Sequence, residues 1–112
     1  MKFLMIFLLV FTSFSASADM RELQTGNDLL YNIKQGKKGD DFSATYIRGY
    51  LRGVTDSLML IGSLCPPDGV DMVQYTDIVE KYLINNPESR NEASVLLTFL
   101  AVGKAFPCKN KG

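Results

Sequence analysis

The sequence contains no histidine and no tryptophan, and it has only two cysteines. Without histidine, the chain cannot form a Ser-His-Asp or Cys-His catalytic group or the histidine pair of a zinc protease. Two cysteines without histidine also offer too few soft ligands for a zinc centre. The acidic residues Asp40, Asp41, Glu88 and Glu92 are better explained as helix-start or solvent-facing side chains than as catalytic pairs. We therefore expect no catalytic residue, no metal site and no cofactor.

The chain also lacks an excess of charge of either sign, with twelve basic and twelve acidic residues. Its densest basic segment, residues 34–38, contains three lysines around a glycine and is typical of a solvated loop. A nucleic-acid-binding protein normally carries a basic face of much larger extent. Nucleic-acid binding is therefore not expected.

Long hydrophobic runs are absent except near the N-terminus, where residues 3–11 are apolar. This run follows Lys2 and precedes small residues at positions 16–18. A basic residue, an apolar stretch too short to span a bilayer, and small residues form the pattern of a cleaved secretory signal peptide. The sequence predicts a signal peptide at residues 1–18 and an exported domain at residues 19–112, with no membrane segment after cleavage.

The two cysteines, Cys65 and Cys108, are expected to pair once the chain reaches an oxidising compartment. A domain of this size buries only roughly 60–65% of the surface of its unfolded chain, so its stability is modest. Cys65 and Cys108 are 43 residues apart in the sequence. Closing this loop with a disulfide would stabilise the fold by about 4 kcal/mol on the chain-entropy model, less any strain. The alternative, two buried free thiols, is less consistent with export. The sequence therefore predicts one structural disulfide.

Helical periodicity, capping residues and helix breakers predict an all-α fold, a small four-helix domain stapled by the disulfide. The predicted helices span about residues 27–35, 40–64, 71–84 and 87–105. Asp40 and Asp71 are the expected N-terminal caps, and Pro87 is the expected first residue of the fourth helix. Glycines and prolines between these ranges end each helix.

The second and fourth predicted helices are apolar around most of their circumference, which is typical of central helices. Short loops make successive helices antiparallel, so these two should run parallel and end on the same side, where Cys65 and Cys108 follow them. Gly49 and Gly53, one turn apart, would let another helix approach closely. We expect that contact within the chain, and an oligomer contact is the alternative.

An ordered series of residues runs through this framework: Tyr46, Gly49, Gly53, Val54, Asp56, Cys65, Pro66, Gly69, Val70, Gln74, Tyr82, Leu83, Pro87, Glu88, Ala93 and Ala105-Phe106-Pro107-Cys108. The series resembles the Rap/Tai family of immunity proteins of bacterial type VI secretion. The resemblance covers residues 46–108 and implies an all-helical, commonly dimeric periplasmic protein that binds and blocks a peptidoglycan-cleaving amidase effector. Many members carry a further cysteine pair in the first half, which this chain lacks.

The leading functional hypothesis is therefore a periplasmic, non-enzymatic immunity protein that forms a homodimer and occludes the active site of an amidase effector. The alternative is a small periplasmic acid-stress chaperone that partly unfolds and binds clients at about pH 2–3, where carboxylates lose their charge. An inhibitor that blocks a cleft needs an exposed, pre-ordered loop, and the polar segment 84–91 fits this description. The predicted partner-binding residues are Asn85, Asn86, Glu88, Ser89 and Arg90.

Overall fold

The computed structural model of the protein describes residues 23–109, so the predicted signal peptide lies outside the described residues. Within this range there are no strands, and the elements are helices. They are α2 (Gly26–Lys37), α3 (Asp41–Leu60), α4 (Met72–Asn85), the 3-10 helix η2 (Pro87–Ser89) and α5 (Ser94–Ala105). The predicted all-α class with four α-helices is confirmed, and so is the disulfide between Cys65 and Cys108.

Side-chain caps fix where three of the helices begin. The carboxylate of Asp40 accepts hydrogen bonds from two backbone amides of α3, and that of Asp71 accepts one from the Gln74 amide at 2.8 Å. Both caps agree with the prediction. The start of α2 carries a reciprocal cap that the sequence reasoning missed. The Thr25 hydroxyl accepts from the Asp28 amide, and the Asp28 carboxylate accepts from the Thr25 amide, both at 3.2 Å.

The end of α3 differs from the prediction, because the helix stops at Leu60 and not near Leu64. Gly62 adopts a left-handed conformation with φ of +75° and donates its amide to the Met59 carbonyl. The next amide, that of Ser63, donates to the Leu58 carbonyl at 2.8 Å. These two bonds form a Schellman motif, which satisfies the last carbonyls of a helix and ends it.

The predicted fourth helix, residues 87–105, is wrong at its start. Pro87 begins only the short η2, and α5 starts at Ser94. The intervening backbone is used elsewhere, because the carbonyls of Arg90 and Glu92 accept the first two amides of α2, at 2.8 and 2.9 Å. A carbonyl that caps another helix in this way is directed out of its own helical path, so the chain turns before α5 can begin.

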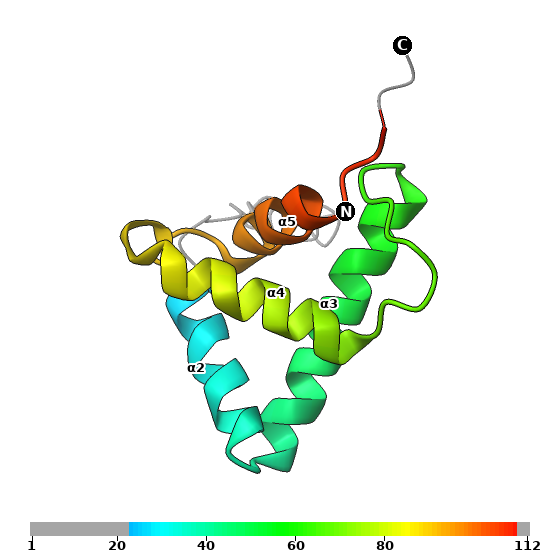
Figure 1. Cartoon of the computed structure of the whole chain (residues 1–112). Coiled ribbons are helices and arrows are strands. Elements are labelled where there is room, and N and C mark those ends of the chain that lie inside the picture. The colour runs from blue at the N-terminus through cyan, green and yellow to red at the C-terminus, as the bar shows by residue number, and fades with distance from the viewer. Residues whose placement is uncertain (1–22, 110–112) are drawn as a thin grey trace, which may run out of the picture.

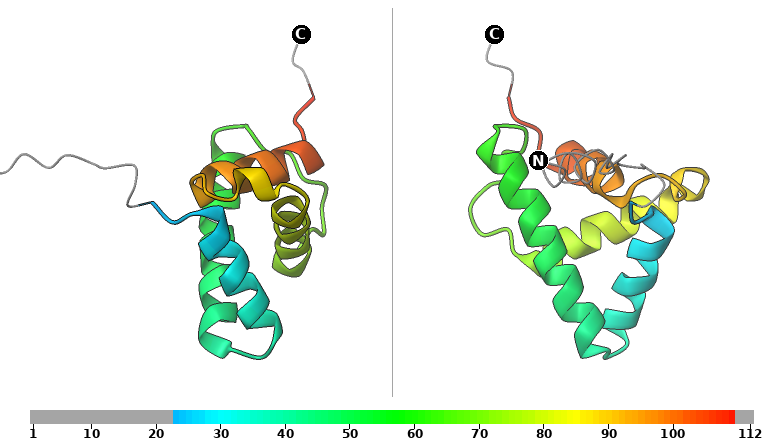
Figure 2. Two further views of the ribbon diagram at one scale, coloured as in Figure 1. Left: turned by 90° about the vertical axis from the view of Figure 1, so that its left-hand side faces the viewer. Right: turned by 180° about the vertical axis from the view of Figure 1, so that it is seen from behind.

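The helices form a hairpin crossed by a second pair. α2 and α3 run antiparallel, and α4 and α5 lie across the open end of this hairpin (Figures 1 and 2). In Figure 1 α4 extends across the view and α5 is seen nearly end-on, so these two helices cross obliquely. The C-terminal ends of α3 and α5 meet, as expected, but the two helices cross, so the predicted parallel course is wrong. Cys65–Cys108 joins these ends across 43 residues of sequence. Next to the disulfide, the rings of Tyr75 and Phe106 pack edge to face with centroids 5.9 Å apart.

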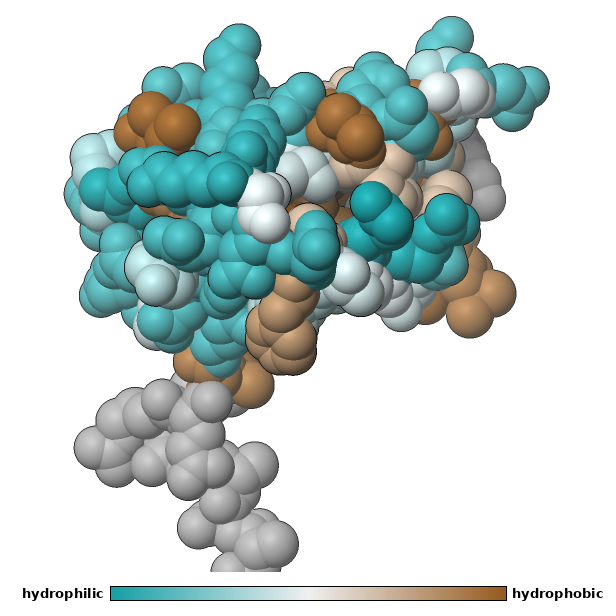
Figure 3. All heavy atoms as spheres, turned by 90° about the horizontal axis from the view of Figure 1, so that it is seen from below, coloured by the Kyte–Doolittle hydropathy of each residue, from teal (hydrophilic) through white to brown (hydrophobic). Residues whose placement is uncertain are grey.

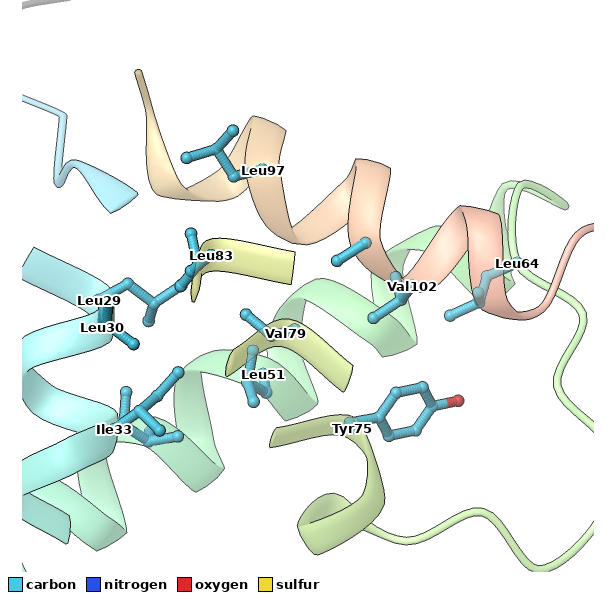
Figure 4. Close-up of a cluster of buried hydrophobic side chains, with 12 residues drawn as sticks. Leu29, Leu30, Ile33, Leu51, Leu64, Tyr75, Val79, Leu83, Leu97 and Val102 are labelled. Atoms are coloured by element: carbon cyan, nitrogen blue, oxygen red, sulfur yellow. The ribbon is translucent and has the colours of Figure 1, made fainter. Parts of the chain in front are cut away.

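One core lies where the two pairs cross, and every α-helix contributes to it (Figure 4). Its most buried hydrophobic side chains are Leu29, Ile33, Leu51, Leu64, Tyr75, Val79, Leu83, Leu97 and Val102. Fully burying a side chain of this size stabilises the fold by about 1.5–3 kcal/mol. None of the described helices combines the length and apolarity that a membrane span requires.

The α3 helix is not surrounded as predicted, because only one stripe of it, Ser43, Ile47, Leu51 and Thr55, is buried. Gly49 and Gly53 lie on the exposed side, and nothing lies within 4 Å of a Cβ built on either one. The expectation of a close contact within the chain at these glycines is therefore wrong. Seen from the end where α2 joins α3, the surface is mostly hydrophilic, and hydrophobic side chains stand out singly (Figure 3).

Candidate functional site

The segment that connects α4 to α5, residues 86–93, is built from consecutive tight turns. The Asn86 side chain closes α4 by donating from Nδ2 to the Tyr82 carbonyl at 2.8 Å. Pro87 fixes the first turn of η2, and the Ser89 and Glu92 amides donate to carbonyls three residues earlier at 3.1 and 3.0 Å. The connecting segment therefore has a defined backbone conformation without a bound partner.

The connecting segment is also fastened to the start of α2, far away in the sequence. Besides the two carbonyls that cap α2, the Ser94 amide donates to the Gln24 carbonyl at 2.7 Å, and Thr25 and Ala93 form an isolated antiparallel bridge. The backbones approach so closely that a Cβ on Gly26 would lie 3.1 Å from the Arg90 carbonyl oxygen and collide with the Leu97 side chain. Gly26 is therefore required for the segment to dock.

Four of the five predicted site residues lie on the connecting segment, and Asn85 is the last residue of α4 just before it, but the five are not equally accessible. Asn85 and Glu88 are exposed, whereas Asn86, Ser89 and Arg90 are partly buried. The Nε of Arg90 is inaccessible to solvent, so its side chain packs along the body of the protein. Of the five predicted residues, the structure brings two to the surface as free side chains.

Two further exposed polar residues, Asn91 and Glu92, extend the same surface. Neither was among the predicted partner-binding residues, although Asn91 ends the predicted polar segment 84–91 and Glu92 was expected to face solvent. The exposed tip therefore presents two amides and two carboxylates, from Asn85, Asn91, Glu88 and Glu92. Such groups accept and donate hydrogen bonds to a polar partner.

A surface depression of about 480 Å³ lies next to the tip, between α4 and α5. It is lined by Ile78, Lys81, Tyr82, Asn85, Asn86, Ala101, Lys104 and Ala105. Asn85 is shared between the tip and the depression, and Lys81 and Lys104 add positive charge beside the acidic tip. This arrangement suits a partner surface that carries both polar and apolar groups.

The hairpin is tied to α4 by one lysine on the other side of the molecule. The Lys37 ammonium contacts the carboxylates of Asp77 and Glu80 at 2.8 and 2.7 Å. Hydrogen bonds first to Asp77 and then to Glu80 raise the pKa of Lys37 above its ordinary value. This exposed network positions α2 against α4, and an apolar depression of about 170 Å³ lies beside it.

Within residues 23–109 no group of three or more His, Cys, Asp and Glu side chains is arranged to hold a metal ion. The connecting segment presents an exposed polar tip, held by hydrogen bonds to a helical frame.

The sequence model of a family described as Rap1a immunity proteins matches residues 25–108. The match includes all four α-helices, the connecting segment and both cysteines. No curated protein and no solved structure matches the chain.

Proposed function

The chain belongs to the family of Rap1a immunity proteins, and from this premise we propose that it is a periplasmic inhibitor of a type VI secretion amidase effector. The family predicted from the sequence is confirmed by this match. Members of such families protect a cell by binding an effector, and they are generally not enzymes. The match over residues 25–108 is the observation that carries the proposal, and it favours the immunity role over the acid-stress chaperone.

The proposed compartment is the periplasm. The disulfide Cys65–Cys108 is typical of a protein that folds under oxidising conditions. Residues 1–18 have the pattern of a cleaved signal peptide, which would deliver residues 19–112 across the inner membrane. An effector that cleaves peptidoglycan acts in the same compartment, so inhibitor and target would meet there.

The proposed mechanism is occlusion of the amidase cleft by the exposed tip of the connecting segment. Asn85 and Glu88 would project into the cleft, with Asn91 and Glu92 beside them. Because the segment is already fastened to α2, binding would cost little conformational entropy. The depression between α4 and α5 would accept a neighbouring part of the effector. A homodimer is part of the same proposal.

The proposal is tested with the amidase encoded by the neighbouring reading frame. Calorimetry should detect a tight complex, and replacing both Asn85 and Glu88 with alanine should weaken it about 30-fold, as expected for two contacts of about 1 kcal/mol each. The matched control removes one carboxylate and one amide at the opposite end of α4, in the double variant Asp68→Ala, Gln74→Ala. Equal affinities of the two double variants would move the contact away from the connecting segment.

A further inference from the structure

The outer face of α3 carries a regular seam that is exposed along its whole length, with contacts to the rest of the described chain only at its edges, at Tyr46 and Asp56. Its positions advance in alternating steps of four and three residues: Phe42, Tyr46, Gly49, Gly53, Asp56 and Leu60. All six are exposed, and the two ends are the most accessible, Phe42 at 79% and Leu60 at 87%. This spacing is the heptad repeat with which two helices pack side by side.

The two glycines in the middle of the seam are unexplained by the fold of one chain. Glycine destabilises an exposed helix interior relative to alanine. Neither Gly49 nor Gly53 is forced by a neighbour, because nothing within residues 23–109 lies within 4 Å of an added Cβ. Both have ordinary helical backbone angles, so no left-handed conformation requires them. A helix from another molecule is the partner that would use such a flat site, because glycines allow two backbones to approach closely.

The seam is symmetric about Leu51, and this symmetry identifies the partner. Gly49 and Gly53 lie two residues to either side of the centre, Tyr46 and Asp56 lie five, and Phe42 and Leu60 lie nine. In an antiparallel pair of identical helices related by a two-fold axis, positions equidistant from the centre face one another. Phe42 would then meet Leu60 of the second copy, and Gly49 would meet Gly53 of the second copy.

The resulting layers are chemically complementary. The outer layers are apolar, the central layers are glycine against glycine, and the intermediate layers place the edge of the Tyr46 ring beside the Asp56 carboxylate. The Tyr46 hydroxyl itself donates to the Gln24 side chain of its own chain. Asp56 takes part in no ion pair within residues 23–109. A parallel pair would instead place the Asp56 carboxylates of the two copies against each other, which is unfavourable.

We infer that two copies of this chain associate through the outer faces of α3, antiparallel about a two-fold axis at Leu51. The homodimer itself belongs to the proposed function, whereas the choice of surface rests on α3 alone. Twenty residues of helix are about 30 Å long, so two such faces form an interface near the lower limit of about 1,000 Å² for specific complexes. A dissociation constant in the micromolar range is expected.

The connecting segment lies away from the C-terminal half of α3, as the front and rear views show (Figures 1 and 2). None of the exposed tip residues, Asn85, Glu88, Asn91 and Glu92, belongs to the seam.

Sedimentation equilibrium of the purified, disulfide-bonded protein from about 1 to 300 µM tests the interface. The wild type should dimerise, and Phe42→Lys or Leu60→Glu alone should each weaken the dimer more than tenfold. The double variant F42K/L60E should regain dimerisation, because the antiparallel pair sets each new lysine against a new glutamate. Tyr31→Lys, which changes an aromatic residue 62% exposed on α2, is the matched control and should dimerise like the wild type.

A wild-type monomer throughout this range would overturn the inference, as would single variants that dimerise normally. A double variant that stays monomeric, like the single ones, would also overturn it. Circular dichroism melting of each variant verifies that it is folded, which is expected because both side chains lie on the surface. Effector binding is measured separately through Asn85 and Glu88, so failure of the dimer and failure of the inhibitor function are distinguishable.

Discussion

Replacing Gly26 with alanine should destabilise the protein, although alanine is normally the better helix residue. Gly26 is the first residue of α2 and lies beneath the connecting segment. The new methyl group would lie 3.1 Å from the Arg90 carbonyl oxygen and 3.1 Å from a methyl of Leu83, and it would collide with Leu97. Arg90 is held in place because its carbonyl accepts the Asn27 amide at 2.8 Å.

The size of the effect follows from the surroundings of this methyl group. Leu83 and Leu97 are each only 1% exposed, so they have no solvent-filled space into which to move. Overpacking of a closed core by one methyl group typically costs about 1–3 kcal/mol. The gain in helix propensity is at most about 1 kcal/mol and is smaller at the first turn. We expect a net loss of about 1–2 kcal/mol, or a fall in Tm of about 4–16 °C for a domain of this size.

Thermal unfolding followed by circular dichroism measures this loss, and hydrogen exchange measures where it acts. The amides of residues 26, 27 and 94 should exchange faster in Gly26→Ala, because they hold the connecting segment to α2. Gly103→Ala in α5 is the matched control: a Cβ there meets nothing within 4 Å, so stability should rise by up to about 1 kcal/mol. A Gly26→Ala variant as stable as the control would refute the proposed close docking.

Three other predictions concern stability. Cys65→Ser should lower the free energy of unfolding, measured by urea titration, by about 4 kcal/mol on the chain-entropy model. Two free thiols in the native oxidised protein would contradict the disulfide between Cys65 and Cys108. Tyr50→Phe should lower the free energy of unfolding by about 1–3 kcal/mol, because the buried Ser94 hydroxyl loses its hydrogen bond to the Tyr50 hydroxyl, 2.7 Å away. An unchanged Tm would show that this hydrogen bond contributes nothing to stability. Burial raises the pKa of Tyr50 and of Tyr75 above the ordinary value of 10.0, so the unfolded state ionises first and stability should fall as pH rises above about 10. Urea midpoints that stay constant from pH 9 to about 12 would contradict this linkage.

Helix positions set by neighbouring residues were predictable from the sequence. Asp40 and Asp71 cap helices through amides two or three residues away, so the signal and its effect lie in one short segment. The ordered residues from Tyr46 to Cys108 also gave the family correctly. Gly62 is a further local signal, because a glycine at the position after the C-cap favours the end of a helix, and the predicted helix wrongly continued through it.

Features that depend on distant contacts were not predictable in the same way. The start of α5 is displaced because carbonyls of the connecting segment cap the first residues of α2, which precede it by more than sixty residues. The same contact makes Arg90 part of the frame, although its sequence position suggested an exposed contact residue. The exposure of Gly49 and Gly53 depends on which side of α3 the other helices cover, and this follows from the crossing of the two helix pairs.

The candidate site depends both on neighbouring residues and on distant contacts, so only part of it could be predicted. Asn85 and Glu88 flank a local capping signal, and both are exposed as predicted. Asn91 and Glu92 belong to the same exposed surface but were not predicted as contact residues. A polar turn was therefore visible in the sequence, whereas its rigid attachment to α2 was visible only in three dimensions.

Inhibition of the amidase encoded by the neighbouring reading frame tests the central claim most directly. The initial rate of peptidoglycan cleavage is measured with a fixed amount of amidase and increasing amounts of the purified, disulfide-bonded protein. We predict that the rate falls to background near an equimolar ratio of the two chains, because each immunity protein occludes one active site. Full amidase activity at a large excess of the protein would contradict the assignment.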